Sequence, residues 1–283
     1  MTTLPCTFVD VFTDVRFEGN GLAVVHDADG LDESLMLAFA RETRLSETTF
    51  VQSATNNGAD YRNRIFMMSG EVPFAGHPSL GTAVAVARAR GEETARYVQQ
   101  THAGLQPIEV RKDGDAWIAS MLQEPPEFGE EPPPDVVLAA VSLEPGEAHP
   151  ELPAQVVATG VPQLLLPVNG LDALERIEPR YEFVNALLQP IGALTLYVFA
   201  IADDGEVRSR AFTATAEMGE DPATGSAAGP VCAYLNARLG WESVAIRQGV
   251  EMGRPSRLSA RVVEDRVEVA GGVVPVIDGT LTL

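Results

Sequence analysis

The sequence predicts an α+β protein of two similar domains, each a curved, mostly antiparallel sheet or barrel wrapped around one central helix. Short runs in which apolar residues alternate with polar ones fill most of the chain, and Gly, Asp and Pro separate them, which indicates antiparallel strands. A stretch rich in proline and glutamate divides the chain. Two apolar helical segments, one on each side of this stretch, resemble each other.

Predicted strands and helices occur on both sides of the dividing stretch. The strand pattern is clearest in CTFVDVFTD, LAVVHD, AWIASML, LTLYVFAIAD and RLSARVVEDRVEVAG. Helical patterns are fewer and lie at residues 32–43, 79–90, 171–177 and 227–239. The second and fourth of these belong to the two central helices, which we assign to residues 77–90 and 226–239.

Residues 124–134, EPPEFGEEPPP, are the dividing stretch. Five prolines, four glutamates, one glycine and one phenylalanine cannot bury a core, and the prolines stiffen the chain. We therefore predict a linker here, with an N-terminal domain at residues 1–123 and a C-terminal domain at residues 135–283. The sequence leaves open whether the strands at the C-terminus cross back to the first domain.

The two helical segments align as an internal repeat. PFAGHPSLGTAVAVARARG and PATGSAAGPVCAYLNARLG each follow an Arg-x-Phe strand. At a constant offset of 149 residues the alignment pairs Pro73 with Pro222, Gly76 with Gly225 and Gly91 with Gly240. Such a duplication predicts two similar domains related by a pseudo-twofold axis.

Both repeated helices are apolar or small over most of their circumference, so strands must wrap them. Their N-terminal ends would then direct free N–H groups and the positive end of the helix dipole toward the space between the domains, as an anion site. Gly76 and Gly225 let these N–H groups approach a ligand closely, and His77 and Ser226 each add a polar side chain. We therefore expect two oxyanion-binding helix starts that face each other.

Charge and composition exclude several classes of partner. Lys and Arg number 20 against 40 Asp and Glu, which gives a formal net charge of −20 and a pI near 4.5, so nucleic acid and anionic membranes would be repelled. The N-terminus lacks the basic start and apolar run of a signal peptide, and no apolar run reaches the length of a membrane span. A cytoplasmic protein is predicted, with Cys6 and Cys232 as reduced thiols.

No cofactor or metal is predicted. The only lysine, Lys112, lies in a turn-like segment and is a poor candidate for a pyridoxal Schiff base. Gly19-Asn20-Gly21 begins like a dinucleotide fingerprint but lacks the third glycine, and GEDPATGS has no phosphate-binding lysine. There is no Cys-x-x-Cys, and no pair with metal-binding spacing occurs among His26, His77, His102 and His149.

A proton abstraction next to a carbonyl or carboxylate also needs a base. Cofactor-free racemases with a duplicated arrangement use two thiols, but the corresponding positions are Gly76 and Gly225, and Cys232 lies well inside its helix. Glu47, in RLSETTFV, is the best remaining base. The alternative interpretation is that Ser46 caps a turn and Glu47 is a solvated surface carboxylate.

Four segments in this order resemble the PhzF family, the phenazine-biosynthesis isomerase and its relatives: SETTFV (46–51), RIFMMSGEVPFAGHPSLGTA (64–83), GEDPATGSAAG (219–229) and QGVEMGRPS (248–256). The resemblance spans nearly the whole chain. It implies a diaminopimelate epimerase-like fold, an active site in the interdomain cleft, a small-molecule substrate and a homodimer. The chain departs from the family's pattern at Met67-Met68 and at Gly21, so the pocket could suit a different substrate.

By position, the resemblance places the acid/base carboxylate on Glu47, a cleft histidine on His77, an aspartate on Asp221 and a serine on Ser226, with substrate-binding amides at Gly76 and Gly225. It implies a cofactor-independent isomerase or epimerase that moves a carbon-bound proton on a small carboxylate-bearing substrate. Each of these side chains also has a purely structural interpretation. Asp221, for example, could serve simply to cap its helix together with Thr224. The alternative functions are a non-catalytic binding protein for a carboxylated metabolite and, less favoured, a hydrolase or lyase that uses the same carboxylate.

Overall fold

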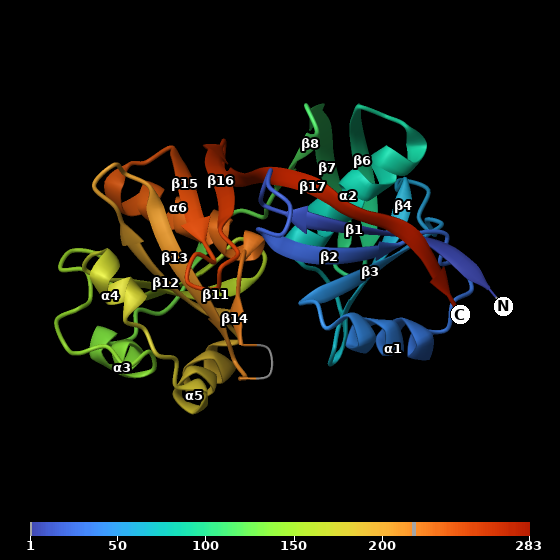
Figure 1. The fold of residues 1–283 in the computed structure, drawn as a ribbon. Helices are drawn as coiled ribbons and strands as arrows, with labels where there is room; N and C mark the ends of the chain where they lie inside the picture. Colours follow the sequence, from blue (N-terminus) through green and yellow to red (C-terminus); the bar gives the residue numbers. More distant parts are fainter. Residues whose placement is uncertain (1, 217–218) are drawn as a thin grey trace. The chain divides into compact units, whose positions relative to one another are not determined.

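The computed structural model describes residues 2–216 and 219–283 and divides into two compact units (Figure 1). Unit 1 comprises Met1–Leu122 and Ala270–Leu283, and unit 2 comprises Gln123–Val269. The sequence placed residues 270–283 within the second domain and left open whether they cross back to the first; in the structure they belong to unit 1. The reason is a long-range pairing that local sequence does not encode: the last strand runs antiparallel to the first, from Thr3 opposite Thr282 to Val11 opposite Val273.

Residues 124–134 are part of unit 2 and do not form a separate linker. Glu127–Phe128 form a short strand, β9, that pairs antiparallel with Val157 and Ala158. The run of prolines ends in a short helix, α3, which begins at Pro134, where a missing N–H costs no hydrogen bond. A proline-rich composition is thus compatible with a short edge strand and with the start of a helix, as well as with the linker that we predicted at residues 124–134.

The strands of unit 1 surround one central helix. Its elements in order are β1 (Thr3–Val11), β2 (Asn20–Val25), α1 (Glu33–Thr43), β3 (Glu47–Gln52), β4 (Tyr61–Met67), β5 (Gly70–Val72), α2 (Gly76–Arg90), β6 (Thr94–Thr101), β7 (Gly104–Asp113), β8 (Ala116–Leu122) and the larger part of β17 (Arg266–Thr282).

Unit 2 carries more helices outside its sheet. Its elements are β9, α3 (Pro134–Ala139), β10 (Gln155–Ala158), β11 (Pro162–Pro167), α4 (Leu171–Glu175), α5 (Tyr181–Ile191), β12 (Thr195–Ile201), β13 (Val207–Thr213), β14 (Glu220–Asp221), α6 (Gly225–Leu239), β15 (Ser243–Gln248), β16 (Ser256–Val263) and the start of β17.

The two units share one order of strand pairing. In unit 1, β1 pairs antiparallel with β2, β2 parallel with β3, β3 and β5 antiparallel with β4, β4 parallel with β6, and β6 antiparallel with β7. In unit 2, strands β10 to β16 repeat this series of antiparallel and parallel pairings. Two similar units of mostly antiparallel strands around a central helix are therefore the architecture of the chain.

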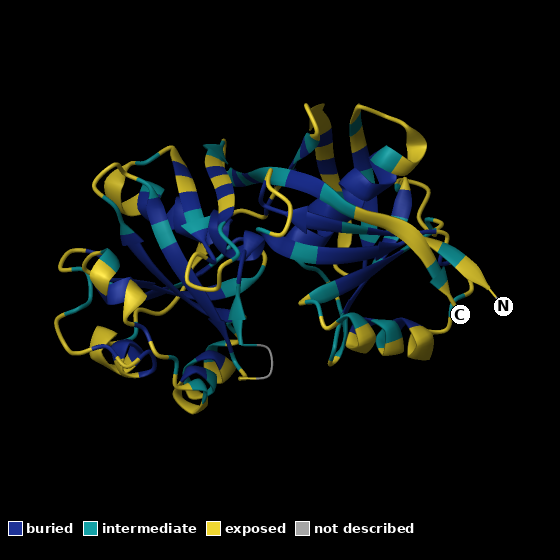
Figure 2. Ribbon diagram, viewed as in Figure 1, coloured by how far each residue is buried: buried dark blue, intermediate teal, exposed yellow. Residues whose placement is uncertain are grey.

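The central helices α2 and α6 are the cores of their units, as Figure 2 shows by their dark blue colour. Residues 76–87 and 225–235 are all buried. Helix α2 contacts strands β1 to β4 and β6 to β8, and α6 contacts β10, β11, β15 and β16. Each helix begins one residue before the predicted start and ends at a glycine in the left-handed conformation, Gly91 with φ 72° and Gly240 with φ 74°.

Close approach of strands to α2 explains one of its glycines. A Cβ atom at Gly81 would lie 2.6 Å from Cδ2 of Leu22 and 2.8 Å from Cγ2 of Val11.

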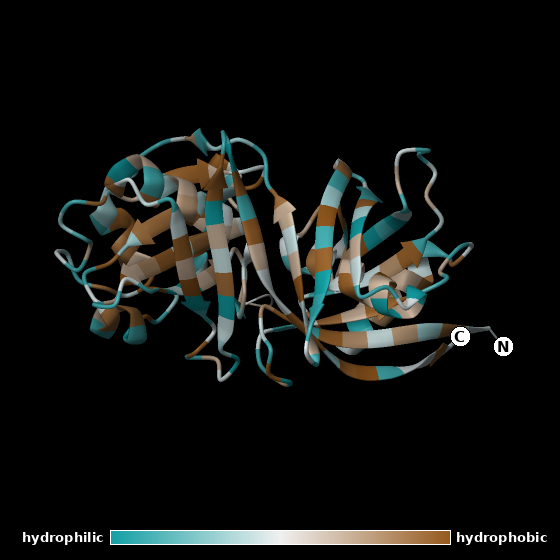
Figure 3. Cartoon of the chain, turned by 90° about the horizontal axis from the view of Figure 1, so that it is seen from above, coloured by the Kyte–Doolittle hydropathy of each residue, from teal (hydrophilic) through white to brown (hydrophobic). Residues whose placement is uncertain are grey.

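The side chains along the strands alternate between hydrophobic and hydrophilic, which is visible as alternating brown and teal bands in Figure 3. Among the described residues, no helix is both long and apolar enough to span a bilayer.

Candidate active site

The first group of predicted site residues lies at the start of α2 in unit 1. Glu47 is the first residue of β3, which runs parallel to β2 with Leu22 opposite Glu47. His77 is the second residue of α2. Its Nε2 atom lies 3.4 Å from Oε2 of Glu47, and the two side chains are only 5% and 14% exposed. The carboxylate that sequence analysis selected therefore contacts the histidine and is not a solvated surface group.

The His77 ring is neutral at physiological pH. Burial lowers its pKa from 6.5 to about 3, because a charged imidazolium would lose its hydration. The contact with Glu47 is therefore between a neutral ring and a carboxylate. The other ring nitrogen, Nδ1, lies 3.3 Å from Nδ2 of the buried Asn20.

Helix α2 begins at Gly76, next to His77. Because Pro78 has no N–H and the Ser79 N–H donates to the Ala75 carbonyl, the N–H groups of this first turn that lie outside the helical ladder are those of Gly76 and His77. The N–H groups in the first turn of a helix have no acceptor within the helix and carry the positive end of its dipole. Ala75, which precedes the helix, has no side chain that could cap them. The Ser79 hydroxyl instead donates to the Ala75 carbonyl at 2.8 Å and accepts from Nε2 of Gln99 at 2.7 Å, which secures the first turn to β6. A bound anion could accept hydrogen bonds from the free amides.

The second group lies at the start of α6 in unit 2. Asp221 ends β14, and its Oδ2 accepts a hydrogen bond of 2.6 Å from the hydroxyl of Thr224, the residue before the helix. Ser226 is 8% exposed, and its Oγ accepts from Nε2 of Gln163 at 3.4 Å. Asp221 thus contacts Thr224, but this bond joins two side chains, and the N-cap residue Thr224 makes no side-chain cap. A catalytic role for Asp221 stays a prediction.

Gln248 organises this second helix start, and sequence analysis gave it no role. The side chain is fully buried. Its Nε2 donates to the Asp221 carbonyl at 2.7 Å and to the Thr224 hydroxyl at 2.9 Å. Its Oε1 accepts from the Thr224 N–H at 3.2 Å and from the Tyr197 hydroxyl at 3.0 Å. The only signal in the sequence was its position in QGVEMGRPS, one of the four segments that carry the family resemblance.

The structure therefore brings the predicted residues together in two groups. Glu47, His77 and Gly76 form one in unit 1, and Asp221, Gly225 and Ser226 form the other in unit 2. Asn20 and Gln248 are the positions that sequence reasoning missed. Both are buried amides whose importance depends on the partner that the fold supplies.

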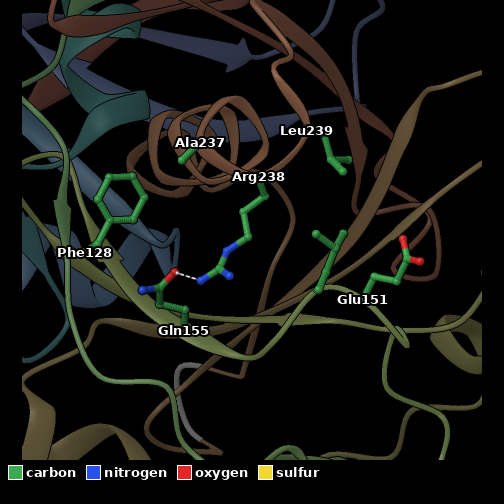
Figure 4. A pocket seen from close by; sticks show the side chains of 7 residues that line it. Phe128, Glu151, Gln155, Ala237, Arg238 and Leu239 are labelled. Carbon is green, nitrogen blue, oxygen red and sulfur yellow. Dashed lines mark hydrogen bonds between the residues drawn. The ribbon is translucent and has the colours of Figure 1, made fainter.

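A separate pocket of about 460 Å³ in unit 2 lies at the other end of α6 (Figure 4). It is lined by Phe128, Glu151, Leu152, Gln155, Ala237, Arg238 and Leu239. The helix has 15 residues, so this end is about 20 Å from Gly225. Its one cationic side chain, Arg238, is already bonded to Glu131 and Gln155. We therefore place the candidate site at the helix starts and not in this pocket.

No group of three or more His, Cys, Asp or Glu side chains within residues 2–216 and 219–283 is arranged to hold a metal ion. Burial raises the pKa of the Cys6 and Cys232 thiols to about 11, so neither is a thiolate at neutral pH. The acid/base candidates of this structure are thus carboxylates and the imidazole described above.

The chain is similar to known proteins over nearly its full length. The model of a family described as phenazine biosynthesis-like protein (PhzC-PhzF) matches residues 9–279. A trans-2,3-dihydro-3-hydroxyanthranilate isomerase of Pseudomonas fluorescens is 36% identical over 285 residues, 97% of this chain and 98% of that protein. An uncharacterized isomerase of Clostridium acetobutylicum is 30% identical and covers 97% of both chains. The crystal structure of a PhzF-family phenazine biosynthesis protein from Bacillus anthracis matches with a TM-score of 0.89 at 27% identity, covering 100% of both chains.

Proposed function

Because this chain belongs to the phenazine biosynthesis-like (PhzC-PhzF) family and is an isomerase, we propose that it moves a carbon-bound proton without a cofactor. In this proposal Glu47 is the acid and base, and the substrate is a small molecule that bears a carboxylate. The observation that carries the proposal is the buried contact of 3.4 Å between Glu47 and the neutral His77, at a helix start with free amides.

Glu47 would remove a proton from one carbon and return it to another on the same face of the substrate. The Glu47 side chain is 14% exposed, so it is mostly buried, and the proton that it takes can exchange with solvent before a proton is returned. Proton transfer by a positioned side chain contributes roughly 10² to 10⁴ in rate. His77, as a neutral hydrogen-bond donor, would orient a heteroatom of the substrate.

The helix starts would bind the negative charge. The amides at Gly76 are suited to a carboxylate or to an oxygen that gains charge as the proton leaves. We propose the same task for the amides at Gly225 and for the Ser226 hydroxyl, and a proton-shuttle role for Asp221. We predict that residues of both helix starts act on the same substrate, and variants at each start can test this.

The substrate is proposed only as a class. Two relatives at 36% identity are named for a dihydro-hydroxyanthranilate, a ring with a carboxylate and allylic carbon. Such a substrate suits a single carboxylate base near anion-binding amides. Met67, Met68 and Gly21 depart from the family's usual residues, so we extend the class and not the compound to this chain.

Isotope exchange tests the proposal. Candidate substrates incubated with the protein in deuterated water should acquire deuterium at carbon, and Glu47→Gln should abolish this while the fold is retained. Glu33→Gln is the matched control, because Glu33 is a 69% exposed carboxylate of the same unit. Equal exchange in Glu47→Gln and the parent would refute the assignment. Binding that stabilises the protein without exchange, and that Glu47→Gln leaves unchanged, would instead support the binding-protein alternative.

Assembly and location are proposals on the resemblance and the composition alone. We propose a homodimer and a cytoplasmic location. Sedimentation equilibrium measures the assembly, and a single species of 30.2 kDa would contradict the dimer. Fractionation of cells that express the protein measures the location.

A further inference from the structure

We propose that Asn20 is a positioning residue: its amide makes Nδ1 of His77 a hydrogen-bond acceptor and so fixes the ring proton on Nε2, the atom next to Glu47. The effect on the ring does not depend on the reaction. The effect on rate rests on the proposed function. The sequence stretch concerned, Gly19-Asn20-Gly21, is the one that begins like a dinucleotide fingerprint and fails to complete it.

The backbone holds Asn20 firmly in place. Asn20 is the first residue of β2 and pairs with Val11 of β1, and the side chain is 2% exposed. Gly19 before it has φ 68°, and a Cβ atom there would lie 2.4 Å from the Val11 carbonyl oxygen. Only glycine therefore allows the chain to turn into β2 at this distance from β1. The glycine of this motif serves the placement of Asn20 rather than a phosphate.

Two contacts of the His77 ring specify the same tautomer. The amide nitrogen of Asn20 can only donate, so Nδ1, 3.3 Å away, must offer a lone pair. A neutral imidazole has one donor nitrogen, which is then Nε2. Nε2 lies 3.4 Å from the Glu47 carboxylate, an acceptor. In the opposite tautomer, the lone pair of Nε2 would face the lone pairs of the Glu47 carboxylate. The N–H at Nδ1 would face the N–H groups of the Asn20 amide.

The tautomer divides the chemical roles. With its proton on Nε2 and Nδ1 occupied, His77 can donate a hydrogen bond but cannot accept a proton from carbon. Removal of the proton is therefore left to Glu47. The hydrogen bond at Nδ1 also orients the ring, so rotation away from the carboxylate would break the bond to Asn20. Asn20 thereby acts on the reaction through His77 and needs no contact with the substrate.

The parent protein by itself tests the assignment. Long-range proton–nitrogen correlation spectra of the ¹⁵N-labelled protein report which ring nitrogen carries hydrogen, and the signals that His77→Gln removes identify the ring among four histidines. We expect a neutral ring protonated on Nε2, unchanged between about pH 5 and pH 8, where an ordinary histidine titrates. A proton on Nδ1, or an imidazolium at neutral pH, would overturn the proposal.

Asn20→Asp tests the cause, because it exchanges a donor for an acceptor at the same size. We expect the proton to appear on Nδ1, the pKa of His77 to rise between two carboxylates, and isotope exchange to fall at least about tenfold. Asn63→Asp is the matched control: Asn63 is 1% exposed in the same unit and donates to Gln99, not to a histidine. The control should leave the His77 spectrum unchanged.

The outcomes separate this inference from the proposed function. A neutral ring that keeps its proton on Nε2 and carries none on Nδ1 in Asn20→Asp would overturn the positioning role. The expected spectra in a protein that exchanges no deuterium into any candidate substrate would sustain the tautomer assignment and count against the isomerase mechanism. Should Asn20→Asp not fold, the spectrum of the parent protein still decides.

Discussion

The starts of α2 and α6 share a frame and differ in what it holds. In each unit an arginine in the strand before the helix pairs with a glutamate in the next strand, Arg64 with Glu71 and Arg210 with Glu220. Each arginine also lies over a phenylalanine ring, at 5.2 and 5.1 Å from its centre. The repeated part is thus the scaffold that leads into the helix.

The side chains at the helix starts are not repeated. The start of α2 carries a buried histidine and carboxylate, whereas the start of α6 carries Ser226 and an aspartate bonded to a threonine. The two helix starts therefore carry different chemistry on a similar backbone. We infer that the α2 start holds the base that acts on carbon, whereas the α6 start binds the substrate and, through Asp221, shuttles protons of its heteroatoms. Four comparisons between the units can break or sharpen this inference.

The largest difference is expected in rate. Glu47→Gln should lower isotope exchange by roughly 10² to 10⁴, the usual contribution of a positioned acid or base. Ser226→Ala removes one neutral hydrogen bond and should cost only about tenfold, equivalent to about 1.4 kcal/mol. Isotope exchange into the same substrate measures both. Losses of equal size would contradict the division of roles.

The scaffold itself should be more sensitive in unit 2. Arg210 donates to both oxygens of Glu220 and to the carbonyls of Leu174 and Ile177, and its side chain is 9% exposed. Removal of one partner of a buried ion pair costs about 3–5 kcal/mol, so Arg210→Met should reduce the free energy of unfolding by this amount.

The matched variant in unit 1 is Arg64→Met. Part of the Arg64 interaction is with Glu33, which is 69% exposed, so the expected loss is smaller, about 1–3 kcal/mol. Urea unfolding followed by a probe in each unit measures the pair. A larger loss for Arg64→Met would show that carbonyl contacts do not strengthen the unit 2 pair.

The central helices could be predicted to within one residue because their signals are local. A helix that is apolar on all sides and ends at glycine needs no knowledge of its partners. His77 and Ser226 were candidates from their place at the helix starts and Glu47 as the best remaining base, whereas Asp221 came from the family motifs. The return of residues 270–283 to unit 1 could not be predicted, because it depends on pairing with residues near position 3.

The supporting amides were missed for a different reason. A buried asparagine or glutamine has no pattern of its own, since its function depends on which donors and acceptors surround it in the fold. Asn20 contacts a residue that is 57 positions away in the sequence, and Gln248 contacts residues that are 24 and 51 positions away. Such contacts leave no trace in local periodicity. They are also the features that make the two helix starts chemically distinct.

A third comparison concerns two buried glutamines that secure the helix starts. Gln248→Leu would leave the Thr224 N–H without its acceptor and remove the bonds of Gln248 with the Tyr197 hydroxyl and the Asp221 carbonyl, at a cost of about 2–3 kcal/mol. Gln99→Leu would remove the contacts of Gln99 with Asn63 and Ser79, at a cost of about 1–2 kcal/mol. Thermal unfolding of both variants measures the difference, and equal losses would contradict the larger structural role that we assign to Gln248.

The fourth comparison concerns acid stability, and it distinguishes the two starts by charge alone. The pKa of His77 is lowered from 6.5 in the unfolded chain to about 3 in the folded one. Between these values the unfolded chain binds a proton that the folded chain does not. The free energy of unfolding therefore falls as pH drops through this window, by up to about 1.4 kcal/mol per pH unit from this group.

His77→Gln should remove this contribution. The free energy of unfolding of the variant should therefore fall less steeply than that of the parent as the pH drops from about 6 to about 4. Ser226→Ala, at the corresponding position of α6, removes a polar group that does not titrate and should leave the slope unchanged. Denaturant unfolding at a series of pH values measures both slopes. An equal slope in His77→Gln and the parent would mean that His77 is already protonated in the folded protein. The ring would then be a cation beside Glu47, and the start of α2 would bind an anion much as we propose for α6, without the neutral donor on which the difference between the two ends depends.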